Sequence, residues 1–113
     1  MAIQKRDIEI RRYCKWTARF TNSSINLTGY GAKMQVRSVK DNSILADLST
    51  EEGNERIIIS PSEGTITMTL LSSETALISE HKGKYDFLLV DPQGENIPIV
   101  EGEVTISQGV TIP

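Results

Sequence analysis

Hydrophobic and polar residues alternate along most of this sequence, and a period of two is typical of β-strands that bury one face. The longest such stretch is residues 83–107, GKYDFLLVDPQGENIPIVEGEVTIS. Within it, Asp91-Pro92-Gln93-Gly94 fits a type I turn, because the aspartate can accept backbone hydrogen bonds, the proline presets φ and the glycine tolerates positive φ. We therefore predict a β-hairpin here, onto which the rest of the chain folds.

The apolar residues of this hairpin also predict its place in a sheet. Before the turn they occupy both faces, with Tyr85, Phe87 and Leu89 on one and Leu88 and Val90 on the other. Such a strand is typical of the middle of a covered sheet. After the turn the apolar positions change from odd to even numbers: Ile97 and Ile99, then Val100, Val104 and Ile106. A change of parity requires an extra residue in the strand, and we predict a β-bulge near Gly102.

The stretch from Tyr13 to Phe20 is the clearest single strand in the sequence. Cys14, Trp16, Ala18 and Phe20 fall on one face, which is predicted to line the core. Cys14 is predicted to be an inert buried thiol, because free cysteine is among the most buried residue types. Trp16 is predicted to contribute most to the core, since aromatic side chains of its size bury about 150–250 Å².

Turn signals divide the rest of the chain into short segments. Further strands are predicted at residues 7–11, 32–37, 44–48, 56–60 and 65–71, with a hairpin turn at 40–43. Residues 72–80, SSETALISE, are the one helical candidate, capped by Ser72 or Ser73 and crossing between sheets. Seven or eight short strands without a βαβ rhythm predict an all-β fold, an immunoglobulin-like antiparallel β-sandwich with one short helix. Residues 1–113 are predicted to form a single domain.

Composition narrows the class of protein. The 113 residues suffice for one core, and a mean hydropathy of −0.23 without a long apolar run indicates a soluble protein that does not span a membrane. The amino-terminal stretch MAIQKRDIEIRR has no apolar signal-peptide core, so we expect synthesis and retention in a cytoplasm. A single cysteine and a single histidine, Cys14 and His81, exclude an internal disulfide and a Cys/His zinc site. A net charge of −3 argues against nucleic-acid binding, and no cofactor is expected.

Residues 49–55, STEEGNE, are predicted to form an exposed acidic loop. Glu51, Glu52 and Glu55 carry the carboxylates that a hard cation such as calcium prefers. The aspartate, asparagine and glycine pattern of a dedicated calcium loop is missing, so the sequence favours a solvated loop over a cation site.

Charge is unevenly distributed along the chain. Residues 1–19 have a balance of +4, whereas the remaining residues have a balance of −7. Such asymmetry can orient a partner or a second copy. The simpler interpretation is a basic edge strand in water, which also discourages unwanted strand pairing.

A series of short motifs, in this order, resembles a family of small phage and prophage structural β-sandwich domains. They are LTGY at 27–30, AKMQVR at 32–37, GTI at 64–66, SSET at 72–75, GKYDF at 83–87, DPQG at 91–94 and EGEVTI at 101–106. The family includes the amino-terminal domains of baseplate upper proteins and tail-fibre components. The chain departs from the family pattern at Arg11 and Arg12, where a small Gly/Asp-type turn would be expected.

This resemblance implies a role in virion assembly and no catalytic residues. The expected partners are other virion proteins and further copies of the chain, located in the virion after synthesis in the host cytoplasm. Because the sequence ends at Pro113, without a coiled coil or receptor-binding module, we expect an adaptor, accessory or decoration subunit. At the predicted interface a basic surface meets an acidic surface on a neighbour; its residues are Arg11, Arg12, Lys15 and Arg19, with Glu101 and Glu103.

Two other functions compete with assembly. A receptor- or glycan-binding module would use loops at the end of the sandwich, with Tyr13, Tyr30 and Asn22 as contacts, although only 5% of the chain is aromatic. An enzyme would use Glu101 and Glu103, whose carboxylates lie about 6–7 Å apart on one side of a strand, near the range of paired glycosidase carboxylates. No nucleophile, phosphate-loop or metal motif accompanies them, so the sequence predicts that the protein is not an enzyme.

Overall fold

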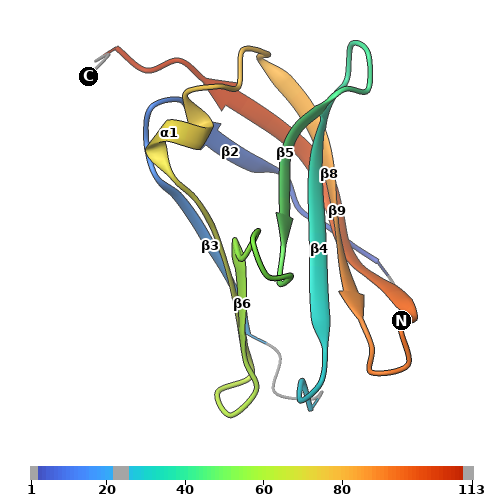
Figure 1. The fold of residues 1–113 in the computed structure, drawn as a ribbon. Coiled ribbons are helices and arrows are strands. Elements are labelled where there is room, and N and C mark those ends of the chain that lie inside the picture. Colours follow the sequence, from blue (N-terminus) through green and yellow to red (C-terminus); the bar gives the residue numbers. More distant parts are fainter. Residues whose placement is uncertain (1–2, 22–25, 111–113) are drawn as a thin grey trace.

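A computed structural model describes residues 3–21 and 26–110 of the chain. Nine strands and one helix are present in this part of the chain, which Figure 1 shows as two facing sheets. In chain order the elements are β1 (Gln4–Lys5), β2 (Ile8–Arg11), β3 (Trp16–Thr21), β4 (Gly31–Ser38), β5 (Ile44–Ser49), β6 (Ile57–Ser60), β7 (Thr65–Leu70), α1 (Ser72–Thr75), β8 (Lys82–Val90) and β9 (Asn96–Ser107).

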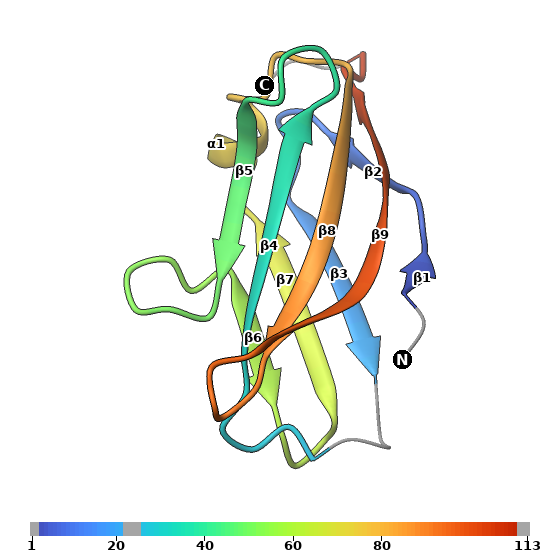
Figure 2. The same ribbon diagram turned by 90° about the vertical axis from the view of Figure 1, so that its right-hand side faces the viewer.

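The larger sheet has the order β1-β9-β8-β4-β5, with β2 also paired to β9, and the smaller has the order β3-β7-β6. Figure 2 looks onto the larger sheet, with the smaller one behind it. This arrangement is that of an immunoglobulin-like sandwich, in which strands B, E and D face strands G, F, C and C′. The predicted all-β sandwich is confirmed, and one pairing was not anticipated: β1 and β2 run parallel to β9. The amino-terminal segment reaches β9 through long-range pairing, which local patterning does not specify.

The core lies between the inward faces of the two sheets, as the alternating pattern predicts. In β8, Tyr85, Phe87 and Leu89 are buried, whereas Leu88 and Val90 on the outer face are half-buried. The Phe87 ring is fully buried and meets Phe20 of β3 edge-to-face, with the ring centroids 5.7 Å apart. Phe87 thus joins the two layers.

Both predicted hairpin turns are confirmed. At the β8–β9 turn, an Asp91 carboxylate oxygen accepts hydrogen bonds from the amides of Gln93 and Glu95, each at 2.9 Å, and Gly94 has φ of +86°. At the β4–β5 turn, Asp41 accepts bonds from both the amide and the hydroxyl of Ser43. These bonds, chiefly those from Ser43, lower the pKa of the Asp41 carboxyl below its usual value.

The bulge in β9 lies at Ile99, whereas the prediction placed it near Gly102. Phe87 pairs with Val100 while Leu88 pairs with Pro98, so Ile99 is the extra residue. Gly102 has a different role, because a Cβ atom there would collide with the carbonyl group of Arg6. The parity of the pattern therefore reveals that a bulge exists, but the glycine marks a close approach of two backbones.

The predicted strand from Tyr13 to Phe20 begins only at Trp16, and the prediction for Cys14 was wrong. Arg12 to Cys14 form a turn in which Tyr13 has φ of +66°. The turn carries Cys14 to the surface, where its thiol is exposed. Trp16 is only half-buried against the core, so it is not the leading core residue either. Hydrophobic and polar residues continue to alternate through this turn, so the pattern alone does not reveal that the backbone changes direction at Tyr13.

The helix α1 spans only Ser72–Thr75, shorter than the predicted 72–80, and it does connect the two sheets as predicted. Neither Ser72 nor Ser73 caps it. The Glu74 carboxylate instead accepts the amide of Leu71 at 2.8 Å and forms an ion pair with Arg56 at 2.7 Å. A carboxylate that binds both an amide and a guanidinium is a stronger cap than a serine hydroxyl.

Candidate functional surfaces

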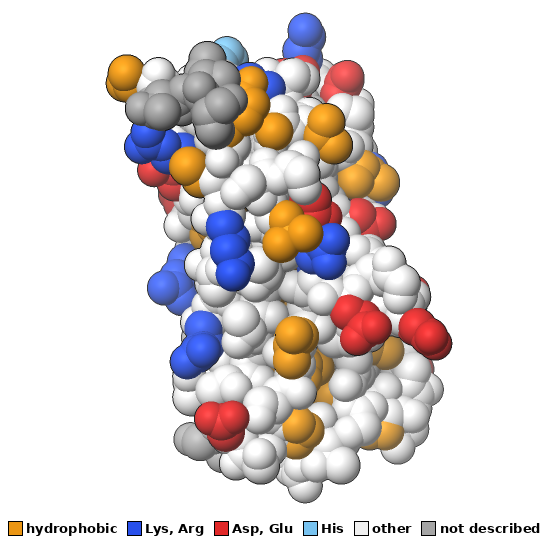
Figure 3. Space-filling view, turned by 60° about the vertical axis from the view of Figure 1, so that its left-hand side comes forward, with side chains coloured by type: hydrophobic (Ala, Val, Ile, Leu, Met, Phe, Trp, Pro, Cys, Tyr) orange, Lys and Arg blue, Asp and Glu red, His pale blue; other side chains and the backbone are white. Residues whose placement is uncertain are grey.

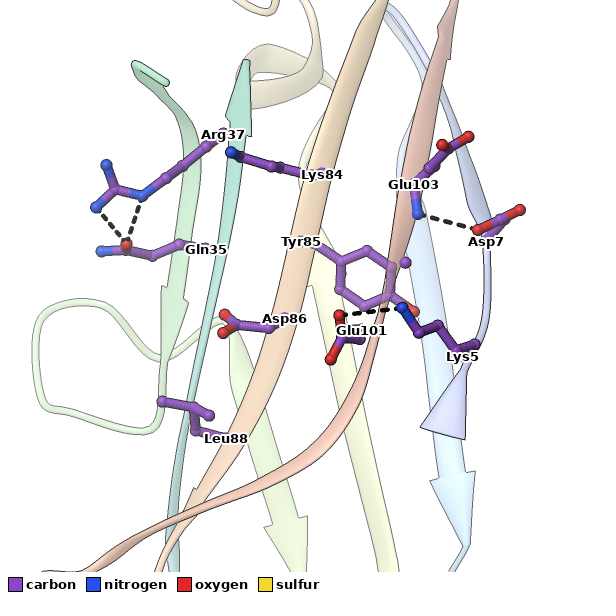
Figure 4. Close-up of a pocket in the computed structure, with 11 residues that line it drawn as sticks. Lys5, Asp7, Gln35, Arg37, Lys84, Tyr85, Asp86, Leu88, Glu101 and Glu103 are labelled. Carbon is purple, nitrogen blue, oxygen red and sulfur yellow. Dashed lines mark hydrogen bonds and ion pairs between the residues drawn. The ribbon is translucent and has the colours of Figure 1, made fainter. Parts of the chain in front are cut away.

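A hollow of about 850 Å³ lies on the outer face of the larger sheet and is the first candidate site. Figure 4 shows its side chains arranged in cross-strand rows. It is lined by Lys5, Asp7, Gln35, Arg37, Lys84, Tyr85, Asp86, Leu88, Glu101, Gly102 and Glu103. Most of these residues are outward positions of β1, β4, β8 and β9, which share one face, and Asp7 comes from the segment after β1. Tyr85 is an inward residue of β8 that borders the hollow, where its hydroxyl reaches Arg6.

Two pairs of like charges stand opposite each other in this hollow. Asp86 pairs in register with Glu101, and Lys84 with Arg37. Such pairs destabilise a sheet. Lys5 offsets the first pair by approaching Glu101 to 3.5 Å. Within the described residues no ion pair joins Lys84 or Asp86, so the hollow displays both signs of charge to a partner.

One edge of the hollow is built around Arg6. Its amide donates to the carbonyl of Glu101 at 2.9 Å, and its own carbonyl accepts the Tyr85 hydroxyl at 2.5 Å. The neighbouring Asp7 carboxylate accepts the amide of Glu103 at 3.0 Å. Asp7 and Tyr85 are therefore used to attach the amino-terminal segment to β8 and β9. Burial raises the pKa of the Tyr85 hydroxyl above its usual value.

We expect Tyr85→Phe to lower the free energy of unfolding by about 1 kcal/mol at neutral pH, because the Arg6 carbonyl loses its donor. The raised pKa means that folding favours the protonated tyrosine. Its contribution is complete below pH 10 and declines as pH rises through the folded-state pKa. Urea titrations from pH 7 to pH 11 should therefore show the gap between wild type and variant narrowing above pH 10.

Tyr30→Phe is the matched control for this measurement. Tyr30 is half-buried, whereas Tyr85 is buried, and in the described chain no hydrogen bond joins the Tyr30 hydroxyl. We expect a change of less than about 0.5 kcal/mol for the control. A gap between wild type and Tyr85→Phe that stays constant to pH 11 would contradict the assigned role of the hydroxyl.

The acidic residues do not gather into a metal centre. Among the described residues, no group of three or more His, Cys, Asp or Glu side chains is placed to hold a metal ion. Glu51, Glu52 and Glu55 are exposed in their loop, which joins β5 to β6. Glu101 and Glu103 share the outer face of β9, but Glu101 binds Lys5.

The structure separates the six predicted interface residues into three places. Arg11 ends β2, and Arg12 and Lys15 follow in the turn to β3, at the corner next to α1. Arg19 is exposed on β3 in the smaller sheet. The two glutamates lie on the opposite layer, in the hollow of the larger sheet. Arg12 is engaged internally, since its guanidinium donates to the carbonyl of Ala76 and to the side chain of Gln108, each at 2.8 Å.

The residues suggested for glycan contact are not brought together. Tyr13 is half-buried at the corner beside α1, whereas Tyr30 is half-buried at the other end of the sandwich, just before β4 (Figure 1). Asn22 lies outside the described residues. The hollow contains one aromatic residue, Tyr85, whose side chain is only 5% exposed. A stacking platform for sugars is therefore missing from the described part of this surface.

The sequence was then compared with known proteins. A scan against models of known families and a search of curated proteins found no match. In the described part of the chain, no helix is long and apolar enough to cross a membrane.

Sequence reasoning missed a second surface, at the corner between β2, β3 and α1. Leu77 is 83% exposed and Leu71 is 43% exposed, next to the exposed Cys14. The pattern placed Cys14 inside and Leu71 at the end of a strand, so no apolar surface was expected.

Proposed function

We propose that this protein is a bacteriophage or prophage virion structural protein that acts through protein–protein assembly. The order of motifs from LTGY to EGEVTI supports this role, as does the compact sandwich that these motifs form. Its partners would be other virion proteins and further copies of the chain.

The observation that carries the proposal is the position of the charged residues. The exposed basic residues Arg11 and Lys15 lie at the α1 end, whereas exposed glutamates lie elsewhere, in the loop between β5 and β6 and on the outer face of the larger sheet. A contact between such different surfaces is heterologous. Repetition of a heterologous contact produces rings or stacked assemblies, which are the forms that tails and baseplates require.

The proposal is tested by locating the protein in particles. We expect a tagged copy, produced in a host that makes the phage, to co-purify with particles through a density gradient in a fixed ratio to other structural proteins. Cryo-electron microscopy should then place sandwich-shaped density of about 41 × 26 × 23 Å in the tail, baseplate or decoration layer. Particles that form normally and contain no copy of the protein would refute it.

A further inference from the structure

The corner beside α1 is a rigid surface of mixed apolar and basic character. We define the α1 corner by its exposed residues, Arg11, Cys14, Lys15, Leu71 and Leu77. The two chain segments that form it are fastened to each other, because the Thr75 hydroxyl donates to the carbonyl of Cys14 at 2.8 Å. Arg12 adds a second link through the carbonyl of Ala76.

The backbone at this corner adopts a costly conformation. Tyr13 has φ of +66°, a region that residues other than glycine, asparagine and aspartate rarely occupy. The guanidinium of Arg12 lies over the Tyr13 ring, 5.0 Å from its centroid. Strained residues are retained where the surrounding contacts impose them, and they often occur at functional positions. The turn therefore presents Cys14 and Lys15 in a fixed arrangement.

An apolar surface in this position is suited to a protein partner. Figure 3 shows hydrophobic side chains interspersed with Lys and Arg in the upper part of the view, and further hydrophobic side chains along the rest of this face. Leu77 is the most exposed of them within α1 and the turn that follows it. In the described chain no carboxylate forms an ion pair with Arg11 or Lys15. Apolar residues bordered by unpaired cations fit a segment that carries carboxylates beside an apolar side chain.

The same chain displays a segment of this kind. The loop at residues 50–56, which we call the acidic loop, joins β5 to β6 and projects from the side of the sandwich (Figure 2). Asn54 fixes the shape of the loop with two hydrogen bonds. Its side-chain amide donates to the carbonyl of Asp47 at 3.1 Å, and its backbone amide donates to the carbonyl of Glu51 at 3.0 Å. Ile58, 64% exposed, follows the loop in β6.

The carboxylates of the acidic loop are available to a partner. Glu52 and Glu55 are exposed, and no ion pair joins either of them within the described residues. Glu51 approaches Lys33 only to 3.8 Å, with 70% of its own side chain exposed. Glu101 is a weaker candidate, because Lys5 already binds it. The acidic loop is therefore the better complement to the α1 corner.

We propose that the acidic loop of one copy binds the α1 corner of a second copy. This inference rests on the assembly role proposed above and names the contact between copies. The acidic loop ends beside α1, where Arg56 pairs with Glu74, but its glutamates and the residues of the α1 corner are separate sets. Each copy therefore has one surface of each kind free after the first contact. The interface is then heterologous, and the chain assembles head to tail. Lys15 would meet the glutamates of the loop, while Leu77 and Leu71 would cover Ile58 beside it.

The decisive experiment uses two charge reversals, Lys15→Glu and Glu52→Lys, and analytical ultracentrifugation at low ionic strength. Wild type should associate with increasing concentration and dissociate as salt is added, since screening shortens the reach of exposed charges to about 8–10 Å at 0.1–0.15 M. Each variant alone should associate at least about tenfold more weakly. An equimolar mixture should associate again, because the intact loop of one variant fits the intact corner of the other and the two reversed charges are once more opposite in sign.

Three further variants complete the test: Val39→Ser is the control for Leu77→Ser, and Glu103→Lys is the control for Glu52→Lys. Leu77→Ser should weaken association, whereas Val39→Ser, which removes a 57% exposed side chain from the β4–β5 turn, should not. Glu103→Lys changes a glutamate in the hollow and should leave association intact. Far-ultraviolet circular dichroism checks that each variant is folded.

Three outcomes would overturn the inference. They are a wild type that stays monomeric at millimolar concentration, a Glu52→Lys variant that associates as well as wild type, and association that is lost with Glu103→Lys. None of them removes the assembly role, because the particle experiment is independent: a monomer in solution that is present in purified particles would keep the proposed function and exclude only this contact.

Discussion

Phe87→Ala is expected to lower the free energy of unfolding by about 3–5 kcal/mol, the largest loss from any single side-chain truncation in this protein. Phe87 is 0% exposed, lies in the middle of β8 and packs edge-to-face on Phe20 across the two sheets. Alanine would remove this contact and leave a cavity that strands held by neighbours on both sides cannot close. Equilibrium urea unfolding, followed by the fluorescence of Trp16, measures the loss.

Leu88→Ala provides the control in the same strand. Leu88 is the next residue along, but its side chain is on the outer face and only half-buried. We expect it to cost about 1 kcal/mol or less. Equal losses at the two positions would show that the β8 register is wrong, because a shift by one residue would exchange the two faces of the strand.

Gly102→Ala is expected to be the second most damaging substitution, costing about 2–3 kcal/mol or more. The new Cβ would collide with the backbone carbonyl of Arg6, and backbone cannot move aside as a side chain can. Three bonds hold that segment in place: Arg6 amide to Glu101 carbonyl, Tyr85 hydroxyl to Arg6 carbonyl, and Glu103 amide to Asp7 carboxylate. To make room for the new Cβ, either these three hydrogen bonds break or β9 moves away from the amino-terminal segment.

Hydrogen exchange locates the damage caused by Gly102→Ala. We expect protection to be lost first in residues 4–11, which pair with β9, while the amides of β4 and β7 retain theirs. Gly31→Ala is the control, because its Cβ would meet a side chain and not backbone: the Thr50 hydroxyl at 3.1 Å, with the Val90 Cβ at an ordinary 3.9 Å. A Gly102→Ala protein as stable as Gly31→Ala would show that β1 and β2 do not cross β9 as described.

The candidate surfaces were less predictable than the fold. The outward residues of the hollow follow from strand alternation, once the order of β4, β8 and β9 is known. Nothing local to Glu101 indicates that Lys5 will be its partner, since the two residues are far apart in sequence. The α1 corner was hidden for a related reason: Tyr13 continues an alternating pattern, yet its backbone turns.

Local patterning was sufficient for the all-β class, the inward face of β8 and the two turns at Asp41 and Asp91. Each of these depends on interactions within a few residues, namely a two-residue side-chain period and carboxylates that bond to nearby amides. Only the tertiary structure decided the parallel pairing of β2 with β9, the exposure of Cys14 and the short α1 held by Glu74 and Arg56. Those features depend on residues far away in the chain, and the contacts that stabilise them form only when the two sheets have come together.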